Sequence, residues 1–146
     1  MATSTEGTCE VTMKRPYSEI IAGAMIAATC VAMGIEPTHR DIEFAKVGEH
    51  SLKLDLYLPK AKNPPLVVWV HGGAWRSGSK ESMQIPGLIA HGFAIASVGY
   101  RLSPVEKFPA QVHDVKAAIR FLRAHASQYG FDSSHVVIAG ASAGGH

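Results

Sequence analysis

The residues best suited to chemistry in this sequence lie around Ser142. The stretch GASAG (140–144) fits the G-x-S-x-G pattern of a serine nucleophile and directly follows the apolar run 136–139. A strand that turns sharply into a helix there leaves the serine on a strained corner with its hydroxyl exposed. Such a corner crowds the backbone, and the glycines Gly140 and Gly144 leave the necessary room. The pattern also occurs in turns without chemistry, so its place after a strand carries the prediction.

A second glycine-rich corner, HGGAW (71–75), follows the apolar run 66–70. A serine that attacks a carbonyl creates an oxyanion, which needs preorganised N–H donors. The candidate donors are the backbone amides of Gly73 and Ala74, joined by that of Ala143 beside the serine. A phosphate-binding loop is the alternative, but the sequence lacks the G-x-x-x-x-G-K-[ST] pattern of that loop. We call residues 71–75 the oxyanion segment.

The segments around both corners predict a parallel α/β sheet preceded by an antiparallel hairpin. Apolar and polar residues alternate around Ile42 and Phe44 and again over 52–58, with a turn at 48–50. Continuous apolar runs predict strands that are buried on both faces. These runs cover 66–70, 93–98 and 136–139.

Two helices are expected between these strands. One begins at Pro109, a favoured first helical residue, and ends near Gly130. Its apolar stripe consists of Val112, Val115, Ile119 and Leu122. A weaker helix spans 80–91. The order of strands and helices is typical of an α/β fold.

Composition is that of a globular domain and points to no charged partner. The chain has 146 residues, of which 47% are apolar and 18% charged, and its net charge is +2. Lysine and arginine are scattered, which argues against a nucleic-acid binder. Neither a metal-binding cluster nor a cofactor motif is recognisable. The two cysteines, Cys9 and Cys30, both precede the predicted fold.

Residues 1–34 read as a leader. A basic start at Met13-Lys14-Arg15, an uncharged apolar stretch over 20–34 and a small-residue exit at Ala32-Met33-Gly34 resemble a signal peptide that begins at Met13. The alternative is a buried or amphipathic N-terminal helix. The stretch is short for a membrane span, which needs about 20 apolar residues, so stable membrane insertion is not expected. A signal peptide implies a secreted or periplasmic protein, and the alternative implies a cytoplasmic one.

Taken together, HGGAW (71–75), GYRLSP (99–104) and GASAGG (140–145) resemble the α/β-hydrolase fold. Within it, residues 40–146 are similar to the esterase and lipase branch related to hormone-sensitive lipase and bacterial feruloyl-type esterases. The resemblance implies a mostly parallel sheet with helices on both faces. It also implies hydrolysis of a small-molecule ester through an acyl-enzyme, with a short-chain acyl ester or an acylated carbohydrate as substrate and no cofactor.

The resemblance assigns roles to individual residues. Ser142 is implied as the nucleophile, and His71 as a brace of the oxyanion segment that is not the catalytic base. Arg101 and Asp114 match positions that support the fold near that segment. Other residues have only a supporting role in the two motifs, namely Gly72, Gly140 and Gly144. Ala74 departs from the pattern, because relatives of hormone-sensitive lipase usually carry a third glycine there.

The proton relay of such an enzyme is missing from these residues. The chain order in this fold is nucleophile, acid and then histidine, and only four residues follow Ser142. His146 is expected to pack or cap, and other candidates precede the serine, namely His113, Asp114, His125, Asp132 and His135. We therefore expect 35–146 to be the N-terminal half of a hydrolase domain, with its last strand at an exposed edge and negligible activity alone.

Two other functions stay open at this point. A serine peptidase or an arylformamidase would use the same corners with a different leaving group. A non-catalytic α/β-hydrolase would bind a small ligand where the ester otherwise lies. An acid and a histidine in the sequence that follows His146 would favour the enzyme.

Overall fold

The computed structural model describes residues 35–146, which belong to one compact unit. The leader predicted from Met13 lies outside the described residues. Among the described residues, no helix has both the length and the apolar character needed to cross a bilayer. The elements in chain order are β1 (His39–Val47), β2 (His50–Tyr57), β3 (Pro65–Val70), α1 (Gly87–Ala90), β4 (Ala94–Val98), α2 (Ala110–Ala124), α3 (Ala126–Tyr129), β5 (Asp132–Gly140) and the 3-10 turn η2 (Ser142–Gly145).

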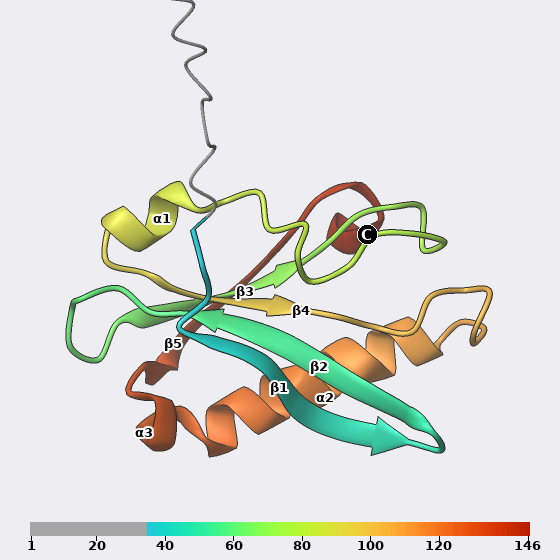
Figure 1. Cartoon of the computed structure of the whole chain (residues 1–146), viewed down its shortest axis with the longest axis horizontal. Coiled ribbons are helices and arrows are strands. Elements are labelled where there is room, and N and C mark those ends of the chain that lie inside the picture. The colour runs from blue at the N-terminus through green and yellow to red at the C-terminus, as the bar shows by residue number, and fades with distance from the viewer. Residues whose placement is uncertain (1–34) are drawn as a thin grey trace, which may run out of the picture. The chain divides into compact units, whose positions relative to one another are not determined.

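The five strands form one mixed sheet in the order β1-β2-β4-β3-β5 (Figure 1). β1 and β2 form the predicted antiparallel hairpin, and β2 also pairs antiparallel with β4. β3 pairs in parallel with both β4 and β5. Because β3 and β5 are parallel neighbours, the two glycine-rich corners that follow them meet at the C-terminal ends of these strands. The predicted α/β fold is confirmed.

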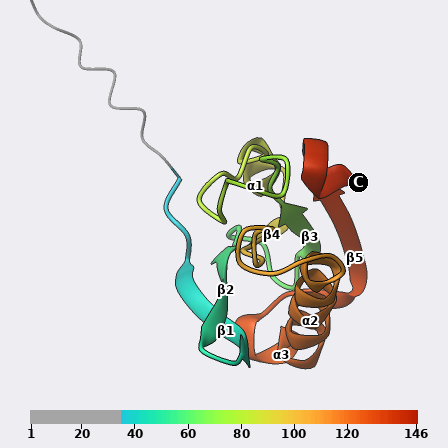
Figure 2. The same ribbon diagram turned by 90° about the vertical axis from the view of Figure 1, so that its right-hand side faces the viewer.

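Helices cover both faces of the sheet, as expected. α2 and α3 lie on one face and α1 lies on the other (Figure 2). The α2 side holds the larger core, in which Leu54, Leu56 and Val68 are fully buried. On the α1 side, Tyr57 and Trp69 pack with residues of and around α1. The central strands β3 and β4 are therefore buried on both faces.

The second half of β2 is buried more than its alternating pattern predicts. Leu52, Leu54 and Leu56 face the α2 side, as the pattern requires. Asp55 and Tyr57 alternate with them and are nevertheless buried. They belong to the opposite face of β2, which the chain between β3 and β4 covers.

The helix expected over 80–91 is wrong in extent, because only Gly87–Ala90 is helical. Pro86 occupies the N-cap position. A proline restricts the residue before it to extended backbone, so a helix cannot run through Ile85 into Pro86. Lys80 is held instead by ion pairs to other parts of the chain.

α2 begins one residue later than expected and turns a different stripe toward the sheet. Pro109 is its N-cap, and Gly130 ends the short helix α3 in a left-handed conformation. Of the predicted apolar stripe only Leu122 is buried, and Val112 is 41% exposed. The buried residues of α2 are Ala110, Gln111, Asp114, Ala118 and Leu122. The helix itself is correctly predicted, but a different face of it is buried. Gln111 and Asp114 lie on that face because they form hydrogen bonds with Arg101, which precedes the helix.

β5 is not buried on both faces, contrary to the apolar run 136–139. Within residues 35–146 it pairs with β3 alone, and Val137 and Ile138 are 58% and 56% exposed. The composition of β5 is that of an inner strand, but its position is at the edge of the sheet. The exposed edge expected for this strand is therefore present.

Candidate active site

Ser142 lies on a strained corner immediately after β5. Ala141 is extended, and Ser142 has a φ of +51°, in the left-handed region that side chains other than glycine rarely adopt. Its side chain is exposed, and the 3-10 turn η2 follows, with the Gly144 amide donating to the Ala141 carbonyl at 2.9 Å. A non-glycine residue held in this conformation is typical of a functional site.

The glycines around Ser142 are required by close backbone packing. A Cβ on Gly140 would lie 2.2 Å from the carbonyl oxygen of Gly144. A Cβ on Gly144 would lie 2.2 Å from the carbonyl oxygen of Val70 and 2.6 Å from that of His71. The corner after β5 therefore rests directly on the end of β3, and any side chain at these positions would push the two corners apart.

The oxyanion segment contains three consecutive residues with positive φ. The values are +115° for Gly73, +52° for Ala74 and +58° for Trp75. The Gly73 carbonyl accepts the amides of Arg76 and Ser77 at 2.9 and 3.0 Å, which closes a tight turn. Within residues 35–146, the amides of Gly73 and Ala74 donate to no other group. Two neighbouring N–H donors are thus left free in this turn.

The two corners touch each other at Gly72. A Cβ on Gly72 would lie 2.7 Å from the Ala141 carbonyl oxygen and 3.3 Å from the Cβ of Ser142. This close approach brings the free amides of the oxyanion segment to the neighbourhood of Ser142. Ala143, the third predicted donor, follows Ser142 in η2. Ala74 adopts a left-handed backbone although it carries a Cβ where relatives of hormone-sensitive lipase usually have glycine. This conformation costs about 1 kcal/mol.

His71 is buried beneath the oxyanion segment. Its Nδ1 lies 2.7 Å from the carbonyl oxygen of Gly72, and its ring stacks on Tyr100 with centroids 4.4 Å apart. Burial lowers the pKa of the imidazole, so it is neutral at pH 7 and its Nδ1–H donates to Gly72. These contacts make His71 part of the support of the segment.

The predicted pair of Arg101 and Asp114 is present, with Asp114 buried and Arg101 partly buried. The Arg101 guanidinium donates from Nε and Nη2 to the two carboxylate oxygens of Asp114 at 2.9 and 2.7 Å, and its backbone amide adds a third bond at 3.0 Å. Gln111 donates to the Arg101 carbonyl at 3.0 Å. α2 thereby fixes the stretch that follows β4.

Other histidines of the described residues lie in structural or exposed positions. His135 pairs with Asp132 at the start of β5, at the opposite end of that strand from Ser142. The ring of His125 stacks on Phe121. His146 is exposed and contacts the edge of Trp75, with ring centroids 5.6 Å apart. Residues 35–146 contain no cluster of three side chains suited to holding a metal ion.

Two apolar cavities adjoin the corners. The first, of about 500 Å³, is lined by Ala74 and Trp75 of the oxyanion segment together with Phe108 and Val112. The second, of about 350 Å³, is lined by Ala143 and by residues of α2 and β5. Each cavity is therefore lined by one of the predicted oxyanion donors, Ala74 in the first and Ala143 in the second.

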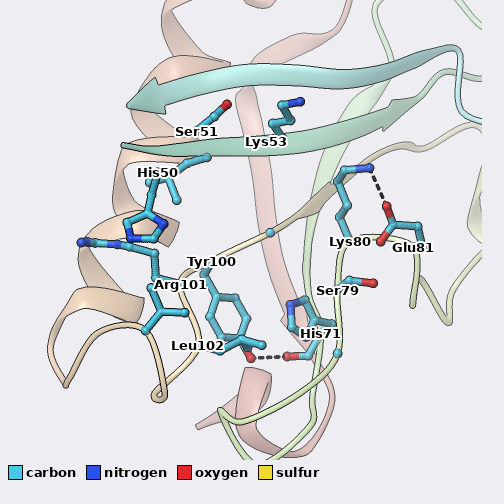
Figure 3. A pocket seen from close by; sticks show the side chains of 14 residues that line it. His50, Ser51, Lys53, His71, Ser79, Lys80, Glu81, Tyr100, Arg101 and Leu102 are labelled. Carbon is cyan, nitrogen blue, oxygen red and sulfur yellow. Dashed lines mark hydrogen bonds and ion pairs between the residues drawn. The ribbon is translucent and has the colours of Figure 1, made fainter. Parts of the chain in front are cut away.

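An ion cluster around the buried Lys80 and Asp55 lies behind the oxyanion segment and was not predicted. Lys80 donates to Asp55 at 2.9 Å and lies 3.0 Å from Asp41. It also donates to Glu81 at 2.8 Å (Figure 3). Burial disfavours the charge of Lys80, but its bonds to these three carboxylates outweigh that effect and raise its pKa. The alternating pattern of β2 gives no sign of it, because Asp55 occupies a position that reads as solvent-exposed.

Tyr100 was also not foreseen as a site residue, although it belongs to the quoted GYRLSP stretch. Its hydroxyl donates to the His71 carbonyl at 2.9 Å, and this bond is buried (Figure 3). A tyrosine two residues after a buried strand is a signal for such a bond, since a buried hydroxyl needs a partner. The sequence does not reveal which partner.

Comparison with known proteins gives a consistent set of relatives. The sequence profile of the BD-FAE family matches residues 54–146. The chain is 38% identical over 88 residues to esterase LipC of Mycobacterium tuberculosis and 37% identical over 111 residues to an arylesterase of Saccharolobus solfataricus. These alignments cover 58% and 73% of the chain, but only 22% and 36% of the relatives.

Solved structures show the same fold. A thermophilic esterase of Thermogutta terrifontis, Est2 with propionate bound, superposes with a TM-score of 0.66 at 31% identity. The match covers 74% of this chain and 43% of that one. A bifunctional GH43-CE protein of Bacteroides eggerthii matches at 40% identity with a TM-score of 0.65, covering 73% of this chain and 16% of its own. Each solved protein is longer than the part that matches.

Proposed function

The chain belongs to the BD-FAE family of α/β-hydrolase esterases, and on that premise we propose that the full-length protein hydrolyses carboxylic esters with Ser142 as nucleophile. The Ser142 Oγ attacks the ester carbonyl carbon, and the carbonyl oxygen becomes an oxyanion. The amides of Gly73, Ala74 and Ala143 donate to this oxyanion. The alcohol then leaves with a proton, and water hydrolyses the acyl-enzyme to release the acid.

The observation that carries the proposal is the contact between the two corners. Gly72 packs so closely against the carbonyl of Ala141 and the Cβ of Ser142 that a side chain at position 72 would not fit. The next two amides along the oxyanion segment have no partner within residues 35–146. A strained serine beside two free N–H donors is the arrangement that acyl transfer needs.

The base that takes the Ser142 proton is proposed to follow Ser142 in the full-length protein, together with the acid that orients it. In this fold the acid and the histidine come after the nucleophile in the chain. The chain spans a minor part of the curated relatives that it matches, which supports this placement. His135, paired with Asp132 at the far end of β5, is unsuited to the role.

The proposed substrate is a small carboxylic ester with an apolar acyl or alcohol part. The lining of the cavities beside Ala74 and Ala143 is mainly apolar and aromatic, which favours such groups, and polar side chains that include Gln111 and His146 contribute to both. Two of the similar solved proteins are described as a propionate-bound esterase and as a carbohydrate esterase from gut microbiota. Short-chain acyl esters, including acylated sugars, are therefore the first substrates to test.

The test is turnover of 4-nitrophenyl acetate and butyrate by the full-length protein and its Ser142→Ala variant. We expect the wild type to be active and the variant to lose at least about 1,000-fold in kcat, because the acyl-enzyme cannot form. Residues 1–146 alone should show negligible turnover. A wild-type protein without esterase activity, or a Ser142→Ala variant that retains it, would reject the proposal.

Export of the protein is a separate proposal, which rests on the sequence of residues 13–34 alone. Fusion of residues 1–34 or 13–34 to a reporter that is active only outside the cytoplasm distinguishes export from an N-terminal helix. Reporter activity from both fusions is expected. Activity from neither would place the protein in the cytoplasm.

A further inference from the structure

Three consecutive left-handed residues cannot hold their own conformation. Ala74 and Trp75 each carry a Cβ at a φ near +55°, where a residue other than glycine is strained. Such strain persists only when surrounding contacts determine the backbone. The free amides of Gly73 and Ala74 therefore depend on whatever holds the two ends of the oxyanion segment.

Both ends are held by the stretch that follows β4. At the start of the segment, the Tyr100 hydroxyl donates to the His71 carbonyl at 2.9 Å. At its end, the Ser103 amide donates to the Trp75 carbonyl at 2.7 Å. The two bonds hold the carbonyl groups of His71 and Trp75. The amides of Gly73 and Ala74 lie between these carbonyls along the chain and stay without a partner among the described residues.

The Tyr100 side of this grip is rigid. Tyr100 and His71 are both buried, and their rings stack at 4.4 Å with an angle of 10° between the planes. Figure 3 shows the Tyr100 hydroxyl and the His71 carbonyl meeting at the base of the segment. Asp114 and Gln111 of α2 hold the neighbouring Arg101 by its amide and carbonyl. These contacts hold Tyr100 in place independently of its bond to the His71 carbonyl.

We propose that Tyr100 is a positioning residue of the oxyanion hole, whose hydroxyl keeps the amides of Gly73 and Ala74 in place beside Ser142. The inference rests on the proposed function. It goes beyond that function because Tyr100 touches neither the nucleophile nor the oxyanion and acts through its contacts with His71. α2 then acts on catalysis through Arg101, Tyr100 and the oxyanion segment in turn.

The test is Tyr100→Phe in the full-length enzyme, which removes the hydroxyl and keeps the stacked ring. Loss of one buried hydrogen bond should lower kcat about tenfold. KM should stay within about twofold, because the oxyanion donors act on the transition state more than on the bound ester. Tyr57→Phe is the matched control, since Tyr57 is equally buried and makes no hydrogen bond to residues 71–75 of the described structure. It should leave both constants unchanged.

A second measurement does not depend on activity. The amides of Arg76 and Ser77 donate to the Gly73 carbonyl, so their hydrogen exchange reports opening of the segment. Exchange at both amides should be about tenfold faster in Tyr100→Phe and unchanged in Tyr57→Phe. Unchanged exchange, or faster exchange with unchanged kcat, would overturn the role of Tyr100. An inactive wild type would instead reject the proposed function, while exchange still tests whether Tyr100 holds the segment.

Discussion

The corner after β3 and the corner after β5 have similar local strain but very different support. Both contain non-glycine residues with φ near +55°, Ala74 and Trp75 in one and Ser142 in the other. β3 is flanked by β4 and β5 and is buried, whereas β5 pairs with β3 alone within residues 35–146 and exposes Ile138. Strain in the oxyanion segment is thus balanced by contacts within the described residues. The corner at Ser142 is supported by its close packing against the end of β3.

The oxyanion segment is therefore the more rigid of the two corners. The carbonyls of His71 and Trp75 accept hydrogen bonds from the chain after β4. Lys80, which follows the segment in the chain, is bonded to Asp55 of β2. Ser142 reaches this platform through the close contacts of Gly140 and Gly144. Substitutions behind the oxyanion segment should therefore cost much more stability than comparable substitutions on β5.

The largest effect is expected at Gly78, which lies behind the oxyanion segment. A Cβ there would lie 2.5 Å from the Gly72 carbonyl oxygen and 2.6 Å from the His71 Nδ1, at a φ of +91°. Gly78→Ala should lower the free energy of unfolding by about 3 kcal/mol, since the crowding adds to the backbone strain. Gly92→Ala is the matched control, because Gly92 has a φ of +86° and open space around it. It should cost about 1 kcal/mol in urea denaturation. Equal losses would show that the segment is not tightly held.

The next effect compares cross-strand partners. Val68 on β3 pairs with Ile138 on β5, and the two side chains are 0% and 56% exposed. In the chain of residues 1–146, Val68→Ala should cost about 2.5 kcal/mol of unfolding free energy, and Ile138→Ala about 0.5 kcal/mol. Denaturation of both variants under the same conditions measures the difference. A larger loss at Ile138 would mean that β5 is covered in solution and would break the comparison.

The smallest expected effect is one of pH. Hydrogen bonds from Lys80 and Ser79 lower the pKa of Glu81 from 4.5 to about 2. In the window between these values the unfolded chain binds a proton that the folded chain does not. Glu81 therefore contributes stability above pH 4.5 that is lost as the pH falls toward 2. Glu81→Gln should flatten the dependence of the unfolding free energy on pH in that window.

Asp132, at the start of β5 and far from the Lys80 cluster in the sheet, provides the control for the pH measurement. Bonds from Ser134 and His135 lower the pKa of Asp132 from 3.8 to about 2. Asp132→Asn should change the pH dependence only below 3.8. A profile of Glu81→Gln that matches the wild type at every pH would show that the bonds of Glu81 to Lys80 and Ser79 add no stability in solution.

The elements and both corners could be predicted because their signals are local. The apolar runs of β3 and β4, the alternation in β2 and the glycines around Ser142 each act within a few residues of the chain. Burial of Asp55 could not be predicted, because it depends on Lys80, 25 residues away in the chain. The bond between Tyr100 and the His71 carbonyl spans 29 residues. Such partners are set by how the strands pair, which an isolated pattern does not specify.

For β5 the prediction failed in the opposite direction, because the strand is more exposed than its sequence predicts. Its composition predicts an inner strand, and its exposure is decided by which strands pair with it. α2 adds a second case, in which Asp114 and Gln111 are buried by specific hydrogen bonds although their residue types favour solvent. In both elements the local pattern predicted the type of structure, and long-range pairing determined which residues are covered.

In the proposed function, Ser142 is the nucleophile and is held against the oxyanion segment. The most direct test of this role is mass spectrometry of the full-length protein after reaction with a fluorophosphonate, which bonds covalently to activated serines. We predict one adduct, located by peptide mapping on Ser142, and none in Ser142→Ala. Labelling of another residue, or equal labelling of the Ser142→Ala variant, would contradict the account.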